Sequence, residues 1–261
     1  MTRRGFALFA VLWMIAALTA LTGAGLLVAR LGSETTRNRV LLARAEWARE
    51  ACADILSARF ATDPTIRALG PIDLGRGTWC RVTVEDPSAK LNLNTADRDA
   101  LAQVMHAVGV SRSVADSVIV RRRSGTIYDL RQVPGLDSAA AARLAPFATT
   151  RGTGVINVNA APPVVLRVLP GVTGETVLVI LGRRATRPLT NADELAGALS
   201  RSSRAALLSN YAEFVRAAVF APPQLVVTIE GGVRPTAIVA RATLTAVPVP
   251  GRLAIVRRET E

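Results

Sequence analysis

The sequence has few residues of the kinds that carry enzyme chemistry. It contains one histidine, His106, and two cysteines, Cys52 and Cys80, so no His/Cys set has the spacing of a metal site. It also lacks a glycine-rich phosphate loop and a nucleophile elbow. Asp97 and Asp99 fall on different faces of a predicted helix and suit the dipole of its first turn. These absences favour a protein that is not an enzyme, and we assign no catalytic, cofactor-binding or metal-binding residue.

Aromatic residues and lysine are also scarce. Phe, Trp and Tyr make up 4% of the chain, which leaves no stacking platform for single-stranded nucleic acid. Lys90 is the only lysine, so arginine carries almost all of the positive charge behind the net +12. Such a balance would suit nucleic acid or anionic lipid. However, the arginines are scattered, a GC-rich genome would produce the same bias, and we expect Arg183-Arg184 and Arg257-Arg258 on solvated faces.

Charge is missing altogether between Phe6 and Ala29. A run of this length can cross the hydrocarbon core of a bilayer, which needs about 20 residues. It is too long for the core of an ordinary secretory signal, which has about 7–15 residues. The sequence therefore predicts a single membrane-spanning helix. Small residues that allow close packing between such helices are Ala16, Ala20 and Gly23.

The helix is predicted to continue beyond the apolar run. An apolar stripe recurs at three- and four-residue steps; its members are Leu41, Ala45, Ala48, Cys52 and Ile55. Asp63-Pro64 should end the helix. Residues 79–86 alternate as a strand that directs Cys80 inward. Both patterns place a cysteine at the same helix–sheet interface, so we predict a Cys52–Cys80 disulfide, with two buried free thiols as the alternative.

Further strands are predicted only near the end of the chain. Residues 225–230 and 238–244 alternate, with Gly231-Gly232 as the expected turn between them, and residues 253–256 read as an edge strand. The residues that separate these strands from the first one are too many for a loop in a compact fold. We therefore expect an inserted domain.

The inserted segment contains an internal repeat. The sequence from Leu91 to Ala96 recurs from Ile156 to Ala161, and later apolar and arginine positions match with compensating gaps. Asn94 and Asn159 precede predicted helices, so we expect them to act as N-caps that bind no ligand. Pro134-Gly135 and Pro170-Gly171 are predicted turns between helices.

Two motifs carry resemblances to known families. Arg-Arg-Gly5 followed by Phe6 resembles the leader of type IV prepilins and pseudopilins, which a prepilin peptidase cuts after the glycine before the new terminus is N-methylated. The repeats resemble the helix-hairpin-helix module. The order of leader, helix, strand, paired repeats and terminal strands is similar to the minor pseudopilin K family of type II secretion systems. Ala10 fits this family, because it stands where most pilin-like proteins carry Glu.

The resemblance implies an α+β fold in which a long N-terminal helix lies on a small antiparallel sheet, with an inserted all-α domain of tandem repeats. We expect a leader at 1–5, a membrane-spanning segment at 6–29 and the first part of the pilin domain at 30–87. The insertion is expected at 88–220, with repeats at 88–150 and 151–220, and the remaining strands at 221–261. The leader motif, rather than flanking charge, places the bulk of the chain in the periplasm.

The implied function is that of a tip subunit that initiates or caps the pseudopilus for export of folded periplasmic proteins. Implied partners are minor pseudopilins I and J, together with H and the major pseudopilin G, prepilin peptidase and inner-membrane lipid. The helix, including the stripe at Leu41, Ala45 and Ala48, is expected to bundle with other subunits. No cofactor is expected; calcium occurs in several pseudopilins, but no residue here is assigned to it.

The alternative is a membrane-anchored periplasmic protein that binds or takes up DNA through its helix-hairpin-helix repeats. Such modules offer the backbone amides of a Gly-x-Gly turn to a phosphate. Neither Gly135 nor Gly171 is followed by that second glycine, and Asp137 would place a negative charge at the first turn. We therefore expect no nucleic acid partner.

Overall fold

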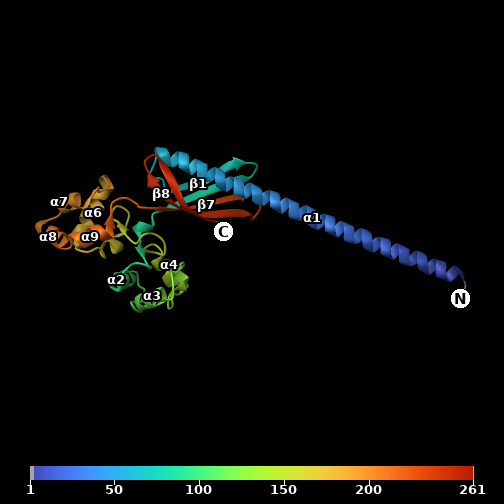
Figure 1. Ribbon diagram of the computed structural model, residues 1–261, viewed down its shortest axis with the longest axis horizontal. Coiled ribbons are helices and arrows are strands. Elements are labelled where there is room, and N and C mark those ends of the chain that lie inside the picture. The colour runs from blue at the N-terminus through green and yellow to red at the C-terminus, as the bar shows by residue number, and fades with distance from the viewer. Residues whose placement is uncertain (1–2, 261) are drawn as a thin grey trace.

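The computed structural model describes the backbone of residues 3–260 and the side chains of residues 10–259. Its largest element is the helix α1 (Arg3–Thr62), whose first half projects away from the rest of the molecule (Figure 1). The helix ends where the sequence predicts, because Pro64 cannot continue it. The Asp63 carboxylate accepts a hydrogen bond from the Thr65 amide at 2.9 Å and turns the chain.

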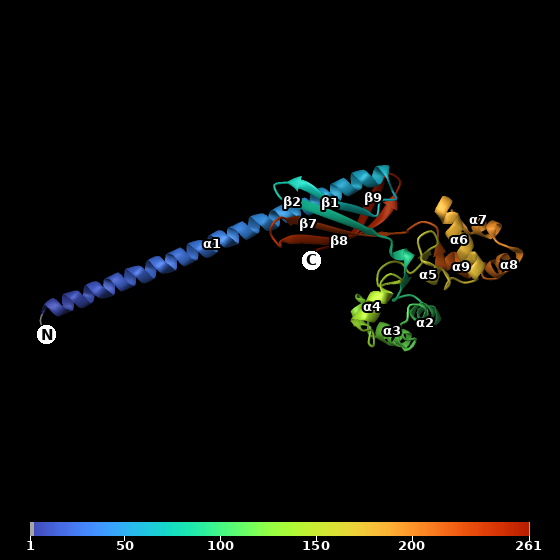
Figure 2. The same ribbon diagram turned by 180° about the vertical axis from the view of Figure 1, so that it is seen from behind.

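The second half of α1 lies on a five-stranded antiparallel sheet of order β1-β2-β7-β8-β9 (Figure 2). The strands are β1 (Ala68–Gly75), β2 (Thr78–Glu85), β7 (Leu225–Val233), β8 (Val239–Val249) and β9 (Arg252–Thr260). Strands β2, β7 and β8 lie where alternation predicts them, and β9 is longer than expected. Strand β1 was missed because Gly70 and Pro71 interrupt its apolar pattern.

One core fills the space between α1 and the sheet. On the helix it contains Ala48, Cys52, Leu56 and Phe60. The sheet contributes alternate residues of its three central strands, namely Cys80, Val82, Val84, Leu225, Val227, Ile229, Ala242, Leu244 and Ala246. The period of two on the strands therefore meets the helical period of α1 in one apolar layer.

Gly231 and Gly232 do not form the predicted turn. Both lie within β7, paired with Ala240 and Val239 of β8, and the chain turns at residues 234–238 instead. Gly231 is required by packing: a Cβ there would lie 2.3 Å from the Ala45 carbonyl oxygen of α1. Close approach of helix and sheet backbones, rather than a positive φ, explains this glycine.

The helices of the central segment come between β2 and β7 in the sequence. In space they lie beyond the end of the sheet that is opposite the projecting half of α1 (Figure 1). The chain first passes through η1 (Pro87–Ala89). A first group is β3 (Leu91–Asn92), α2 (Arg98–Ala107), α3 (Ser113–Arg123), η2 (Leu130–Gln132), α4 (Ser138–Leu144) and β4 (Ala148–Thr149). A second group is β5 (Ile156–Asn157), α5 (Pro163–Leu166), α6 (Gly174–Thr186), α7 (Ala192–Ala198), α8 (Arg201–Ser209), α9 (Tyr211–Ala217) and β6 (Ala218–Val219).

Each group begins and ends with a two-residue strand, and the two strands pair in parallel. Strand β3 pairs with β4, and β5 pairs with β6. The segment is therefore not purely helical, whereas we expected an all-α domain from the sequence. Such short bridges carry no alternation that a sequence pattern can reveal. They close the two stretches of chain over one continuous apolar core.

Candidate assembly interface

The N-terminal half of α1 is an exposed apolar surface. Within the described residues, α1 is the one helix long and apolar enough to span a membrane, and none of its apolar window is covered by the molecule. Ala10, Ala16, Ala20 and Gly23 are all exposed on it. Gly5 and Phe6 lie outside the residues whose side chains are described, so their processing stays a prediction.

The predicted contact stripe on the second half of α1 is not available to another subunit. Ala45 and Ala48 have no exposed surface, because β7 and β8 cover them. The large apolar residues left exposed on this part of α1 are Val40, Leu42 and Trp47, which are 50%, 46% and 59% exposed. The periodicity located the buried face of the helix correctly, but the sheet occupies that face.

Cys52 of α1 and Cys80 of β2 lie opposite each other in the core. In the structure their sulfur atoms are bonded and their Cα atoms are 6.0 Å apart. Both side chains are fully buried. The link attaches the soluble half of α1 to the strand that leads into the central segment.

The repeated asparagines do not cap helices, contrary to the expectation from sequence. The α2 N-cap is Asp97, whose carboxylate accepts from the Ala100 amide at 2.7 Å. Asn94 instead binds the backbone of Ile127 in both directions: its Oδ1 accepts from the amide at 2.9 Å and its Nδ2 donates to the carbonyl at 2.9 Å. Its Nδ2 also donates to the carbonyl of Thr150 at 3.0 Å.

Asn159 repeats this arrangement in the second group. Its side chain accepts from the Leu189 amide at 2.9 Å, and it donates to the carbonyls of Leu189 at 2.8 Å and Phe220 at 2.7 Å. Each asparagine therefore joins three segments that are far apart in sequence. Spacing alone could not reveal this role, because the bonded partners lie 30 or more residues away.

An arginine accompanies each asparagine. Arg122 donates to the Ala96 carbonyl at 2.8 Å, and Arg184 donates to the Ala161 carbonyl at 2.7 Å. Both side chains are half-buried, and burial lowers the pKa of each guanidinium. Arg184 thus lies in the fold rather than on the solvated face that we expected.

The turns that could grip a phosphate are occupied by the protein itself. At the first turn of α4, the Asp137 carboxylate accepts from the Ala140 amide at 2.7 Å. Gly171, with φ of +72°, lies against α8: a Cβ there would be 2.7 Å from the Ala206 carbonyl oxygen. A phosphate would have to displace a carboxylate at one turn and a helix at the other.

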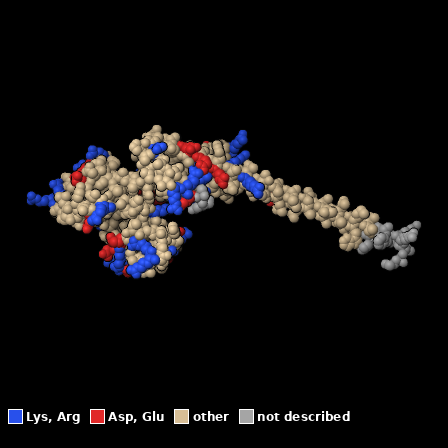
Figure 3. Space-filling model, viewed as in Figure 1, with Lys and Arg blue, Asp and Glu red and all other residues tan. Residues whose placement is uncertain are grey.

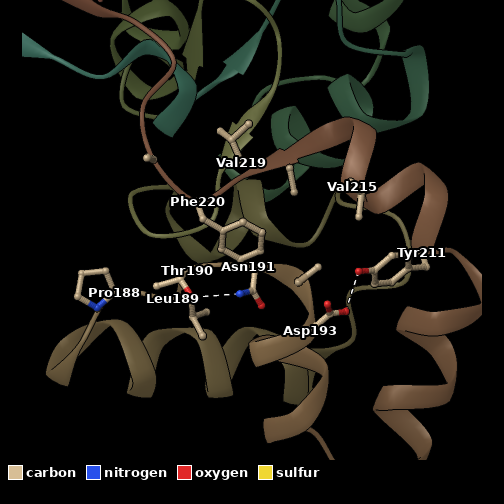
Figure 4. A pocket seen from close by; sticks show the side chains of 12 residues that line it. Pro188, Leu189, Thr190, Asn191, Asp193, Tyr211, Val215, Val219 and Phe220 are labelled. Atoms are coloured by element: carbon tan, nitrogen blue, oxygen red, sulfur yellow. Dashed lines mark hydrogen bonds between the residues drawn. The ribbon is translucent and has the colours of Figure 1, made fainter. Parts of the chain in front are cut away.

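A hollow lies between α7 and α9 in the second group (Figure 4). It is an open depression of about 710 Å³, and the side chains that line it include Leu189, Val215 and Phe220. The Tyr211 hydroxyl donates to Asp193 at 2.8 Å at its rim. That bond raises the pKa of Tyr211. His106 lies elsewhere, exposed beside Arg98 and Arg112 on the first group.

The described residues contain no group of three or more His, Cys, Asp or Glu side chains placed to hold a metal ion. The surfaces that distinguish the molecule are instead its long apolar helix, the sheet that covers half of that helix, and a large domain between two neighbouring strands. These features define a pilin-like fold of the α+β class.

Comparison with solved structures identifies this fold more closely. The chain is similar to a chain in the crystal structure of the GspK–GspI–GspJ complex from the type 2 secretion system of enterotoxigenic Escherichia coli. The TM-score is 0.53 at 15% sequence identity, over 89% of this chain and 99% of that chain. The protein therefore has a GspK-like pseudopilin fold. No family model and no curated protein matches the sequence.

Proposed function

We propose that the protein is a minor pseudopilin that occupies the tip of a type II secretion pseudopilus and has no catalytic activity of its own. The observation that carries this proposal is the GspK-like fold along almost the whole chain, including the domain inserted between β2 and β7. That domain is too large to lie beneath another subunit in a tight helical fibre, so the end of the fibre suits it.

The proposal includes processing and location. Cleavage between Gly5 and Phe6 and methylation of Phe6 would leave an apolar helix that holds the protein in the inner membrane, with the sheet and the inserted domain in the periplasm. The 88–150 and 151–220 repeats form that inserted domain. Support comes from the exposed apolar half of α1 and from the parallel bridges that close each repeat.

Minor pseudopilins I and J are the proposed partners, with H, the major pseudopilin G and prepilin peptidase following from the same role. The structurally similar complex contains GspI and GspJ. On this chain, Val40 and Trp47 are exposed on one side of α1, and Leu42 is exposed on another, so the apolar surface continues beyond the membrane-spanning part. Large apolar side chains left exposed beside a membrane anchor are suited to packing against another subunit.

The test is copurification of the full chain with minor pseudopilins I and J from membranes. Trp47→Glu should reduce the recovered complex strongly, whereas Tyr128→Glu, on a still more exposed aromatic of the inserted domain, should leave it unchanged. Recovery of no complex, together with salt-dependent binding of duplex DNA, would favour the DNA-binding alternative.

A further inference from the structure

Five arginines surround the end of the folded part that faces the apolar half of α1. Three of them are on the helix just beyond the apolar run, and two are on loop tips of the sheet. We define the basic rim as Arg37, Arg39, Arg44, Arg76 and Arg234. All five are exposed, and none forms an ion pair with a residue whose side chain is described. Figure 3 shows Lys and Arg side chains where α1 leaves the folded part, and none along the described apolar half.

The two loop tips are held together by the backbone. The Arg234 amide donates to the Gly77 carbonyl at 2.8 Å, which joins the 234–238 loop to the β1–β2 turn. Arg76, at the tip of that turn, adopts a φ of +53°, a conformation that glycine or asparagine adopts at lower cost. The fold therefore presents a strained arginine beside a second arginine at one end of the sheet.

Two of the helical arginines, Arg37 and Arg44, lie on the side of α1 that adjoins the loop tips, whereas Arg39 is on the opposite side of the helix. Arg37 and Arg44 are seven residues apart, and each precedes by four residues a member of the sheet-facing stripe, Leu41 or Ala48. Residues at this spacing lie on one side of a helix. Leu41 packs beside Val233 and Ile238 of the loop region. The rim thus extends from the helix onto the two loop tips.

Acidic residues near the rim are fewer than the arginines, and most of them are engaged. Glu34 pairs with Arg30 at 3.3 Å, and the Asp73 carboxylate accepts from the Gly75 amide at 2.8 Å. Glu46 is exposed further along the helix. Glu230, on β7, pairs with Arg241 at 2.6 Å. A net positive surface therefore remains.

The height of the basic rim above the membrane follows from helix geometry. Arg37 is eight residues past Ala29, which corresponds to about 12 Å along the axis. The headgroup layer takes up roughly 5–8 Å of that distance. The remaining gap is no more than about one Debye length at physiological salt, so Arg37 feels the surface charge directly. Arg44 is seven residues further along the helix and lies about 10 Å higher. The membrane-spanning segment of α1 holds the basic rim beside a bilayer, so lipid is favoured over nucleic acid as its ligand.

We propose that the basic rim docks on anionic phospholipid headgroups of the outer leaflet in which α1 is inserted. The inference rests on the proposed function in one respect, the membrane-spanning role of α1. Contact at the rim would tilt the sheet and the inserted domain toward the bilayer and set their orientation before assembly. The proposed ligand is the charged lipid surface rather than a single bound phosphate, because the arginines are spread over a helix and two loop tips and do not surround a pocket.

The experiment places the full chain in nanodiscs of phosphatidylcholine, or of equal parts phosphatidylcholine and phosphatidylglycerol. Trp79, whose ring lies against Gly232 near the loop tips, is the reporter after Trp13→Phe and Trp47→Phe. A headgroup nitroxide should quench Trp79 more strongly in the anionic nanodiscs, and high salt should abolish the difference. Arg76→Gln with Arg234→Gln should weaken this headgroup contact by more than about tenfold.

The matched control is Arg123→Gln with Arg201→Gln, which removes the same charge from exposed positions of the inserted domain and should change nothing. Quenching of Trp79 that is equal in both lipids would overturn the proposal. So would rim-dependent binding of duplex DNA without any lipid effect. A separate variant that keeps only Trp13 reports insertion through acyl-chain quenchers, so failure of the membrane anchor is distinguished from failure of the rim.

Discussion

At the scale of single residues, the inserted domain depends on asparagine side-chain amides that hydrogen-bond to backbone groups in place of other peptide groups. Asn94 and Asn159 each satisfy one peptide N–H and two carbonyls of separate segments. The adjacent Asn92 and Asn157 accept from the amides of Asn94 and Asn159 at 2.8 and 3.0 Å. The repeated Asn-x-Asn motif therefore holds two loops and a strand end together, and it needs no bound ligand to explain it.

Asn159→Ala should destabilise the protein by about 2–4 kcal/mol, because it leaves several half-buried backbone groups of Leu189 and Phe220 without partners. Urea unfolding of the purified chain measures the change. Asn191→Ala is the control: Asn191 caps α7 through the Glu194 amide at 2.8 Å, and its loss should cost about 1 kcal/mol. Equal effects of the two substitutions would show that Asn159 acts as an ordinary cap.

At the scale of elements, the contact of α1 with the sheet depends on glycine and on the cysteine link. Helix and strand backbones approach closely at Gly231, where an added Cβ would also lie 2.6 Å from the Arg49 nitrogen. Larger side chains fill the interface on the far side of this point, where Phe60 and Leu56 pack. The helix is therefore nearest to the sheet toward its membrane-facing end.

Gly231→Ala should destabilise the sheet region by about 2–3 kcal/mol, because neither the helix backbone nor the central strand can move aside independently. Thermal unfolding followed by circular dichroism measures this. Gly70→Ala in the edge strand β1 adds the same methyl group where nothing lies within 4 Å, and it should stay within about 0.5 kcal/mol of the original protein. A tolerant Gly231→Ala variant would contradict the close approach.

The Cys52–Cys80 link should contribute about 3 kcal/mol for its sequence separation of 28. We expect Cys52→Ser with Cys80→Ser to lower the unfolding temperature of the helix–sheet region more than that of the inserted domain. Thiol labelling of the denatured protein from the periplasm should find no free thiol. Two labelled cysteines per chain would show that the bond does not form in the cell.

At the scale of the whole molecule, a buried joint connects the sheet to the inserted domain. Asp86 follows β2 and is 8% exposed; its carboxylate accepts from the Ser88 amide at 2.9 Å and from the Asn157 Nδ2 at 2.7 Å. Pro87 packs against Gly152. The joint therefore ties the end of β2 to the second repeat and helps to set the direction in which the inserted domain leaves the sheet.

Asp86→Ala should loosen this joint, because Asn157 loses a buried partner. Lys90 offers a direct readout: it is the sole lysine of the chain, so a lysine-specific protease cuts only there. In the native fold Lys90 pairs with Glu85 and is 24% exposed. We expect the cleavage rate to rise by at least about tenfold, because the substitution removes buried hydrogen bonds from both Ser88 and Asn157. Asp73→Ala at the β1–β2 tip should not alter the rate.

Local pattern by itself determined the long helix with its end at Pro64, the alternating strands, the meeting of the two cysteines and the presence of a repeat. These properties follow from apolar spacing at 3.6 and 2.0 residues and from residues that stop a helix, which act over a few neighbours. The order of the same elements was enough to suggest the pseudopilin K resemblance. The long run without charge likewise predicts a membrane span, since length and polarity decide that property.

Only the tertiary structure decided which partner each side chain meets. The sequence predicts an assembly surface at Ala45 and Ala48 of α1, but in the structure β7 covers that face. Gly231 reads as a turn until the helix backbone is seen above it. The sequence predicts that Asn159 caps a helix, but in the structure it binds Leu189 and Phe220, which are 30 and 61 residues away. The physical reason is the same each time: spacing along the chain specifies which side of an element is apolar or polar, whereas long-range packing determines what lies against that side.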